Sequence, residues 1–118
     1  MITFFSINKD YVAMLGREQN KQKHSHYGIQ LLIPLSKINV NESTTRYPVF
    51  IDSHISHYVY GEVEIFSFLI NPSSNLGRRI KQSFFHFENK EIVYINNFNL
   101  TRYAENMTKN MNNLEDIQ

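Results

Sequence analysis

Up to residue 70, apolar residues fall in short runs that polar stretches separate. The runs are rich in β-branched and aromatic residues and have the lengths of strands. The predicted strands are residues 2–7, 11–15, 27–35, 48–51, 58–60 and 63–70, and the separating polar stretches are residues 17–23, 36–46 and 71–75. Several short strands at this spacing predict a sandwich or a barrel.

The pattern changes after residue 70. Apolar residues then recur at helical spacing with cations between them, which predicts a short amphipathic helix over residues 73–86. Ser73 or Ser74 can cap its start, because both follow the turn at Asn71 and Pro72. A last strand is expected over residues 91–95 and a second helix over residues 100–111, with residues 112–118 frayed. Strands followed by helices favour a mainly β fold with helical appendages.

Length and composition exclude several classes of protein. The 118 residues point to one domain, with residues 1–95 as a barrel-like part that carries the 73–86 helix and residues 96–118 as a C-terminal helix. The formal net charge is +1 and the cations are spread along the chain, so no basic face for nucleic acid is indicated. Cysteine is absent, which excludes disulfides and thiolate chemistry. The apolar runs are too short to span a bilayer and the N-terminus lacks the features of a secretory signal, so we expect a cytoplasmic protein without membrane contact.

The histidines are the clearest candidates for chemistry. His24 and His26 stand two residues apart at the head of a predicted strand, so an extended backbone turns both to the same face. Gln30 lies four residues further along and shares that face if the strand is regular. Cross-strand pairing can bring His57 opposite this group. Three imidazoles and one amide oxygen would suit a divalent metal ion such as Fe, Mn, Ni or Zn.

A structural role for these histidines is the alternative. Histidine is common at strand ends, half-buried and hydrogen-bonded to the backbone. No second carboxylate stands nearby to complete an acid/base pair, and the sequence offers no Ser-His-Asp pattern. We therefore expect no bound cofactor and no catalysis, and if a metal is bound, its ligands are His24, His26, Gln30 and His57.

Three segments resemble known family motifs, and together they cover roughly residues 23–85. Residues 24–30, His-Ser-His-Tyr-Gly-Ile-Gln, resemble the first cupin motif, which is His-x-His, three residues, then Glu or Gln. Residues 48–57 resemble the second motif, where a Pro-Gly-type turn precedes a histidine, although Asp52 and Ser53 stand at the turn here. Residues 68–80 are similar to a segment of AraC-type sensor domains, of the form Phe-Leu-x-x-Pro-x-Ser-x-x-Gly-Arg.

The resemblance implies a cupin-type β-barrel, also called a double-stranded β-helix or jelly roll, with one or two C-terminal helices. It further implies the effector-sensing and dimerisation domain of an AraC-type transcription regulator, which binds a small molecule inside the barrel. The expected ligand-binding residues are His24, His26, Gln30 and His57, with walls from Tyr27, Phe50, Tyr58 and Phe66. The identity of the effector stays open.

The second predicted helix suggests association into a homodimer. Its apolar stripe offers Leu100, Tyr103, Met107 and Met111 as a dimerisation face, or else it covers one end of the barrel. DNA would be contacted only through a helix-turn-helix domain that this sequence does not contain, so the chain is expected to be an isolated domain or a stand-alone relative. Two alternative functions are a small metal-dependent cupin enzyme (a dioxygenase, isomerase or epimerase) and a stand-alone sugar- or partner-binding cupin.

Overall fold

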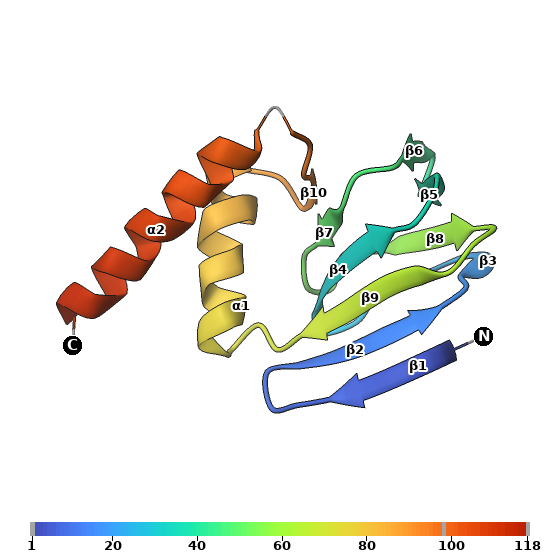
Figure 1. Cartoon of the computed structure of the whole chain (residues 1–118), viewed down its shortest axis with the longest axis horizontal. Helices are drawn as coiled ribbons and strands as arrows, with labels where there is room; N and C mark the ends of the chain where they lie inside the picture. Colours follow the sequence, from blue (N-terminus) through green and yellow to red (C-terminus); the bar gives the residue numbers. More distant parts are fainter. Residues whose placement is uncertain (1, 98, 118) are drawn as a thin grey trace.

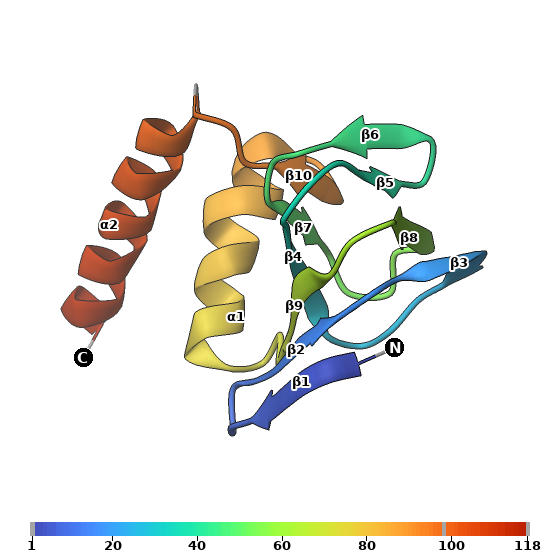
Figure 2. The same ribbon diagram turned by 45° about the vertical axis from the view of Figure 1, so that its right-hand side comes forward.

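The computed structural model describes the backbone of residues 2–97 and 99–117 and the side chains of residues 6–97, 99–106, 108 and 109. The fold is mainly β, with two antiparallel sheets and a layer of helices (Figure 1). The helices lie on one side of the larger sheet and the smaller sheet lies on the other (Figure 2). In the part of the chain described, the strands form these two sheets and not one closed ring.

Both sheets are built from strands distant in the sequence. The six-stranded sheet has the order β1 (Ile2–Ile7), β2 (Tyr11–Gly16), β9 (Ile65–Ile70), β4 (Ile29–Pro34), β7 (Val49–Ile51) and β10 (Ile92–Tyr94). The four-stranded sheet has the order β3 (Gln19–His24), β8 (His57–Gly61), β5 (Ile38–Val40) and β6 (Ser43–Thr45).

The sequence pattern predicted the larger sheet better than the smaller one. Strands β3, β5 and β6 fall in stretches that were expected to be polar connections, which is a correction. All six residues of β3 are exposed, and the strand forms an edge of its sheet. Edge strands are commonly polar and charged, as β3 is with Lys21 and Lys23, so they lack the apolar alternation that indicates a strand.

The central strands supply two different cores because successive side chains point to opposite faces of a sheet. One face of the larger sheet packs against the smaller sheet, in a cluster of Leu32, Ile38, Val40, Val49, Ile51, Val59 and Ile65. The other face packs against the helices, in a cluster of Ile29, Phe50, Ile70, Ile80, Phe84, Phe85, Val93 and Tyr103. We call these the inner core and the outer core.

The helical layer begins with α1 (Asn75–Ile80) and continues directly into a π-helical turn, η1 (Lys81–His86). Both lie in the predicted helix, although the sequence pattern did not indicate the π-helical turn. The consecutive residues Phe84 and Phe85 are both buried in the outer core, 6% and 2% exposed. Burial of a phenylalanine side chain stabilises the fold by about 1.5–3 kcal/mol. The two rings of this turn therefore contribute much of the packing between the helices and the sheet.

The start of α1 explains the spacing of the segment that resembles AraC-type sensors. The Ser74 hydroxyl accepts a hydrogen bond from the Gly77 amide at 3.0 Å and donates one to the Asn71 carbonyl at 2.6 Å. A Cβ atom on Gly77 would clash with the Asn71 carbonyl oxygen and would lie 2.7 Å from the Cα atom of Pro72. Glycine is therefore required at this position, because α1 folds back tightly onto its own turn.

Helix α2 (Leu100–Ile117) begins where predicted and continues past residue 111, through residues that were expected to fray. Tyr103 was predicted to lie on a dimerisation face, but it is 2% exposed and its ring packs on Phe84 with centroids 4.8 Å apart. This is a correction, since the residue is used inside its own chain. Leu100 is exposed, and the side chains of Met107 and Met111 lie outside the part that the structure describes. Within the described residues, no helix has the length and apolar character needed to cross a membrane.

Candidate histidine site

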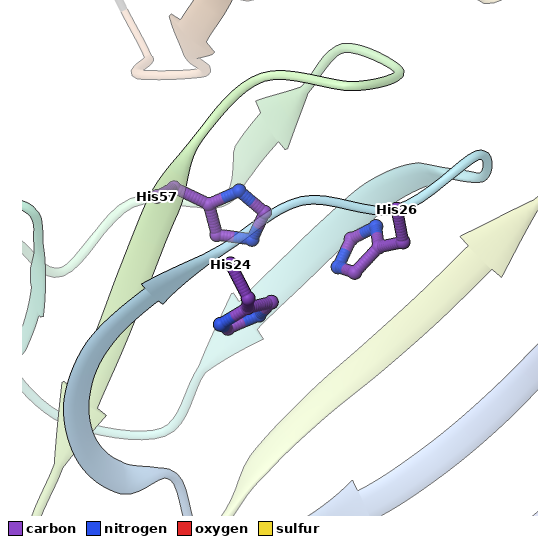
Figure 3. Close-up of side chains that lie close together, drawn as sticks. All are labelled: His24, His26 and His57. Carbon is purple, nitrogen blue, oxygen red and sulfur yellow. The ribbon is translucent and has the colours of Figure 1, made fainter.

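Three of the five histidines meet between the two sheets, as the sequence predicted. His24 ends β3 and His57 begins β8, and the two residues are direct partners in the antiparallel register. His26 lies two residues beyond His24, in the connection that enters β4. The three rings face one another, with centroids 4.7 Å apart for His24 and His57, 5.0 Å for His26 and His57, and 5.4 Å for His24 and His26 (Figure 3).

The site runs from the surface into the interior. His24 is exposed, His26 is half-buried and His57 is fully buried. One ring nitrogen of each histidine lies within 4.8 Å of the corresponding nitrogens of the other two. The ring of His24 is therefore the end of the site that solvent reaches.

Backbone carbonyl groups orient the imidazoles. The Nδ1 atom of His57 donates to the Ile55 carbonyl oxygen at 2.7 Å. Longer contacts of 3.4 Å join Nδ1 of His24 to the Gln22 carbonyl and Nδ1 of His26 to the Gly28 carbonyl. A carbonyl oxygen can only accept, so each contact favours the tautomer with its proton on Nδ1. In this tautomer each Nε2 atom carries a lone pair, although Nε2 of His57 already contacts the Gln30 side chain.

Gln30 joins the site from the opposite sheet. Its side chain is buried, its Oε1 atom lies 2.9 Å from Nε2 of His57, and its Nε2 atom donates to the Ser67 hydroxyl at 2.9 Å. In this amide orientation His57 donates from both ring nitrogens, which requires the imidazolium form. The neutral imidazole is satisfied when the amide turns by half a rotation, since its NH₂ group then donates to His57 and its oxygen accepts from Ser67. The orientation of the Gln30 amide is thus coupled to the protonation state of His57.

Burial controls the charge of the two inner histidines. Desolvation lowers the pKa of His57 below 6.5, and the neighbouring charges of His24 and His26 lower it further, against the opposing hydrogen bond to Ile55. Desolvation likewise lowers the pKa of His26, partly offset by its hydrogen bonds and by the attraction of Glu18. Neutral imidazoles are the form that binds metal ions or accepts hydrogen bonds from a ligand.

The loop between β7 and β8 holds His26 in place. The backbone amide of His54 donates to the His26 carbonyl oxygen at 2.8 Å. His54 has a φ of 62°, a left-handed conformation that is uncommon outside glycine. Its ring also packs edge-on against Tyr27, with centroids 5.9 Å apart. The unusual backbone of this loop therefore serves to position the connection that carries His26.

The four predicted wall residues do not join the histidines. Tyr27 is 57% exposed and bonds outward to Ser73. Tyr58 follows His57 directly and so points to the other face of β8. Phe50 belongs to the outer core, and Phe66 shares its face of β9 with Phe68, which packs on that core. The alternation of side chains along a strand places Phe50, Tyr58 and Phe66 on the opposite side of their sheets, and Tyr27 lies in the connection before β4.

Three contributors to the site were missed in the sequence. Ser67 closes the Gln30 network, and a signal was present, because it is the polar residue in the apolar strand Ile65–Ile70. His54 acts through its backbone amide, which no side-chain pattern reveals. The negative charge of Glu18 raises the pKa of His26. The sequence alone does not show that these two residues are close in the folded chain.

The donor set fits a divalent transition metal ion. Neutral imidazoles are ligands that Zn, Fe, Mn and Ni accept, and the Gln30 side chain must release Nε2 of His57 before that nitrogen can bind. Two nitrogens bound to one zinc ion lie at most about 4.2 Å apart, which is close to the 4.8 Å limit found here. Each Nδ1 contact with a carbonyl oxygen is also the outer-shell arrangement typical of metal-binding histidines.

Comparison of the chain with protein-family models, with curated proteins and with solved structures gives no match.

Proposed function

We propose that the chain is a small-molecule sensing domain of cupin type, related in function to the effector-binding part of AraC-type transcription regulators. The observation that carries this proposal is a direct connection between the histidine site and the first helix. Tyr27 directly follows His26, and its hydroxyl shares a hydrogen bond of 2.9 Å with the Ser73 hydroxyl. Ser73 precedes the residue that caps α1.

A second connection runs in parallel. Asp52 forms an ion pair with Lys81 of η1 at 3.4 Å, and it lies in the same loop as His54, whose amide holds the His26 carbonyl. A ligand that draws the histidines together moves this loop and Tyr27, and both contact the helical layer. The ligand thereby shifts an existing equilibrium between positions of α1, as sensing requires. DNA would be contacted by a separate helix-turn-helix domain, and the homodimer stays part of this proposal.

The test is a thermal-shift screen of the full chain against monosaccharides and small organic acids. A hit should raise the unfolding midpoint of the wild type and have no effect on His26→Ala. In NMR spectra it should shift the amide signals of residues 73–77, and Tyr27→Phe should bind it while those shifts shrink. A ligand that binds the histidines but leaves the α1 signals unchanged would contradict the sensing proposal.

The second candidate is a small metal-dependent cupin enzyme, and the three ring nitrogens that lie within 4.8 Å of one another favour it. A bound metal ion would supply Lewis acidity, while His24, His26 and His57 would hold it and Gln30 would complete or orient the set. Elemental analysis of protein purified without chelator tests this directly. Stoichiometric metal that is absent from His26→Ala would favour the enzyme, whereas metal-free protein with an intact fold would favour the sensor.

A further inference from the structure

The outer face of the larger sheet carries a cavity that the histidine site does not use. It has a volume of about 310 Å³, is partly open, and lies between the sheet and the α1–η1 segment. Among the described residues, its lining comprises Tyr11, Leu31, Phe50, Phe68, Ile70, Leu76, Ile80 and Phe84. Figure 2 shows α1 against the side of β9 that faces away from β8 and β3, so this cavity and the histidines lie on opposite sides of the sheet.

The chemistry of the lining restricts what can bind. None of these eight side chains is charged, and Tyr11 brings the one hydroxyl among them. Four of the eight are aromatic, and their rings meet at angles that leave faces and edges available. Tyr11 and Phe68 meet edge to face at 5.7 Å, and Phe50 and Phe84 are tilted at 4.6 Å. An aromatic ligand gains from such edge and face contacts, while a charged one would lose its hydration without a partner.

The size of the cavity fits more than one ring. An apolar cavity of about 150 Å³ holds a benzene molecule, so about 310 Å³ accommodates two rings. A cavity left empty costs packing, because its lining atoms lack partners on one side. The π-helical turn η1, which places Phe84 in this wall, is a second observation, since such turns are frequent at functional sites.

We propose that this cavity is a second ligand site, and that it takes an uncharged aromatic molecule of about two rings. The proposal is independent of the function of the histidine site. The segment α1–η1 forms one wall of the cavity, and Tyr27 and Asp52 contact Ser73 and Lys81 just before and just after α1. The two sites would therefore act on the same helical segment from opposite sides of the sheet.

The experiment is a fluorescence titration of the full chain with 1-naphthylamine, an uncharged two-ring probe whose emission shifts to shorter wavelength in apolar surroundings. Its 8-sulfonate analogue has the same rings and a negative charge, so it is the matched control ligand. The uncharged probe should saturate at one per chain and bind at least about tenfold more tightly than the sulfonate. Equal affinity of the two, or no saturable binding, would overturn the proposal.

Two substitutions in β4 locate the probe. Leu31→Trp fills the cavity, whereas Ile33→Trp adds the same side chain on the same face of the strand, at an exposed position outside the lining. The chain contains no natural tryptophan, so each variant has one indole. Leu31→Trp should weaken binding by about tenfold or more and Ile33→Trp by less than about twofold, with circular dichroism to confirm the fold.

Two further results would contradict the assignment. If His57→Asn abolishes probe binding and Leu31→Trp does not, the probe lies between the sheets. If Leu31→Trp converts a wild-type dimer into a monomer by sedimentation, a second copy of the chain occupies the cavity. Leu76→Phe, which fills it from the helix side, replaces Leu31→Trp if that variant fails to fold.

Discussion

The two faces of the six-stranded sheet differ in what their side chains do. On the inner side, Gln30 and Ser67 interrupt an apolar surface and reach the buried His57. On the outer side, the same strands present Leu31 and Phe68 to an aromatic layer beneath the helices. The neighbouring residues Gln30 and Leu31 of β4 therefore have different roles, since Gln30 forms hydrogen bonds and Leu31 packs in the outer core. One sheet thus separates a polar environment from an apolar one with no intervening domain.

The largest expected effect is on the outer side. Phe84→Ala removes a buried ring that touches Phe50 and Tyr103, so we expect the free energy of unfolding to fall by about 3–5 kcal/mol. Urea unfolding followed by circular dichroism measures it. Phe87→Ala is the control, because this ring is 42% exposed and its loss should cost about 1 kcal/mol or less. Equal losses in the two variants would show that the outer core is not organised around Phe84.

Gly77→Ala tests how closely α1 presses on the turn before it. The added Cβ would lie far inside contact distance of the Asn71 carbonyl, so the variant should lose about 1–3 kcal/mol of stability. Gly28→Ala is the matched control, since its Cβ would meet nothing nearer than 3.5 Å. If the two substitutions cost the same, the glycine in this motif is not a packing requirement.

On the inner side, Gln30→Leu should cost about 1–3 kcal/mol, because it leaves buried polar atoms of His57 and Ser67 without their partner. Gln22→Leu makes the same chemical change at an exposed position of β3 and should alter stability by no more than about 0.5 kcal/mol. Denaturant midpoints compare the two. If Gln30→Leu leaves the free energy of unfolding unchanged, the hydrogen-bond network adds no stability to the inner core.

The pH dependence of stability sharpens the comparison further, because only the inner side holds buried titrating groups of this kind among the described residues. Desolvation lowers the pKa of His26 and His57 below 6.5 in the folded chain, so the unfolded chain takes up protons first as the pH falls. The free energy of unfolding should have its highest value above pH 6.5. It should decrease as the pH falls through the lowered pKa values of the two histidines and should then become constant.

Urea midpoints between about pH 5 and pH 8 measure this dependence, and His57→Asn should reduce its slope. Stability that rises as the pH falls would contradict the neutral state assigned to the two histidines.

The sequence allowed much of this arrangement to be predicted, and the failures have physical causes. The grouping of His24 with His26 followed from the two-residue period of an extended chain, and His57 was expected opposite them through cross-strand pairing, which the register of β3 and β8 confirms. The placement of Phe50 and Phe66 could not be inferred, because a shift of one residue in register exchanges the two faces. Strand β3 was missed because an exposed edge strand needs no apolar residues, and Tyr103 was misplaced because an apolar stripe does not specify whether its own chain covers it.

The network that closes the histidine site also has a consequence for how the chain folds. Its two hydrogen bonds join residues 27 and 37 positions apart, His57 with Gln30 and Gln30 with Ser67. Contacts between such distant residues form only after large loops have closed, and proteins rich in them fold in milliseconds to seconds. The histidine site therefore cannot exist in an early, locally ordered intermediate. A spectroscopic label that senses His57 would report the last stage of folding, when the two sheets meet.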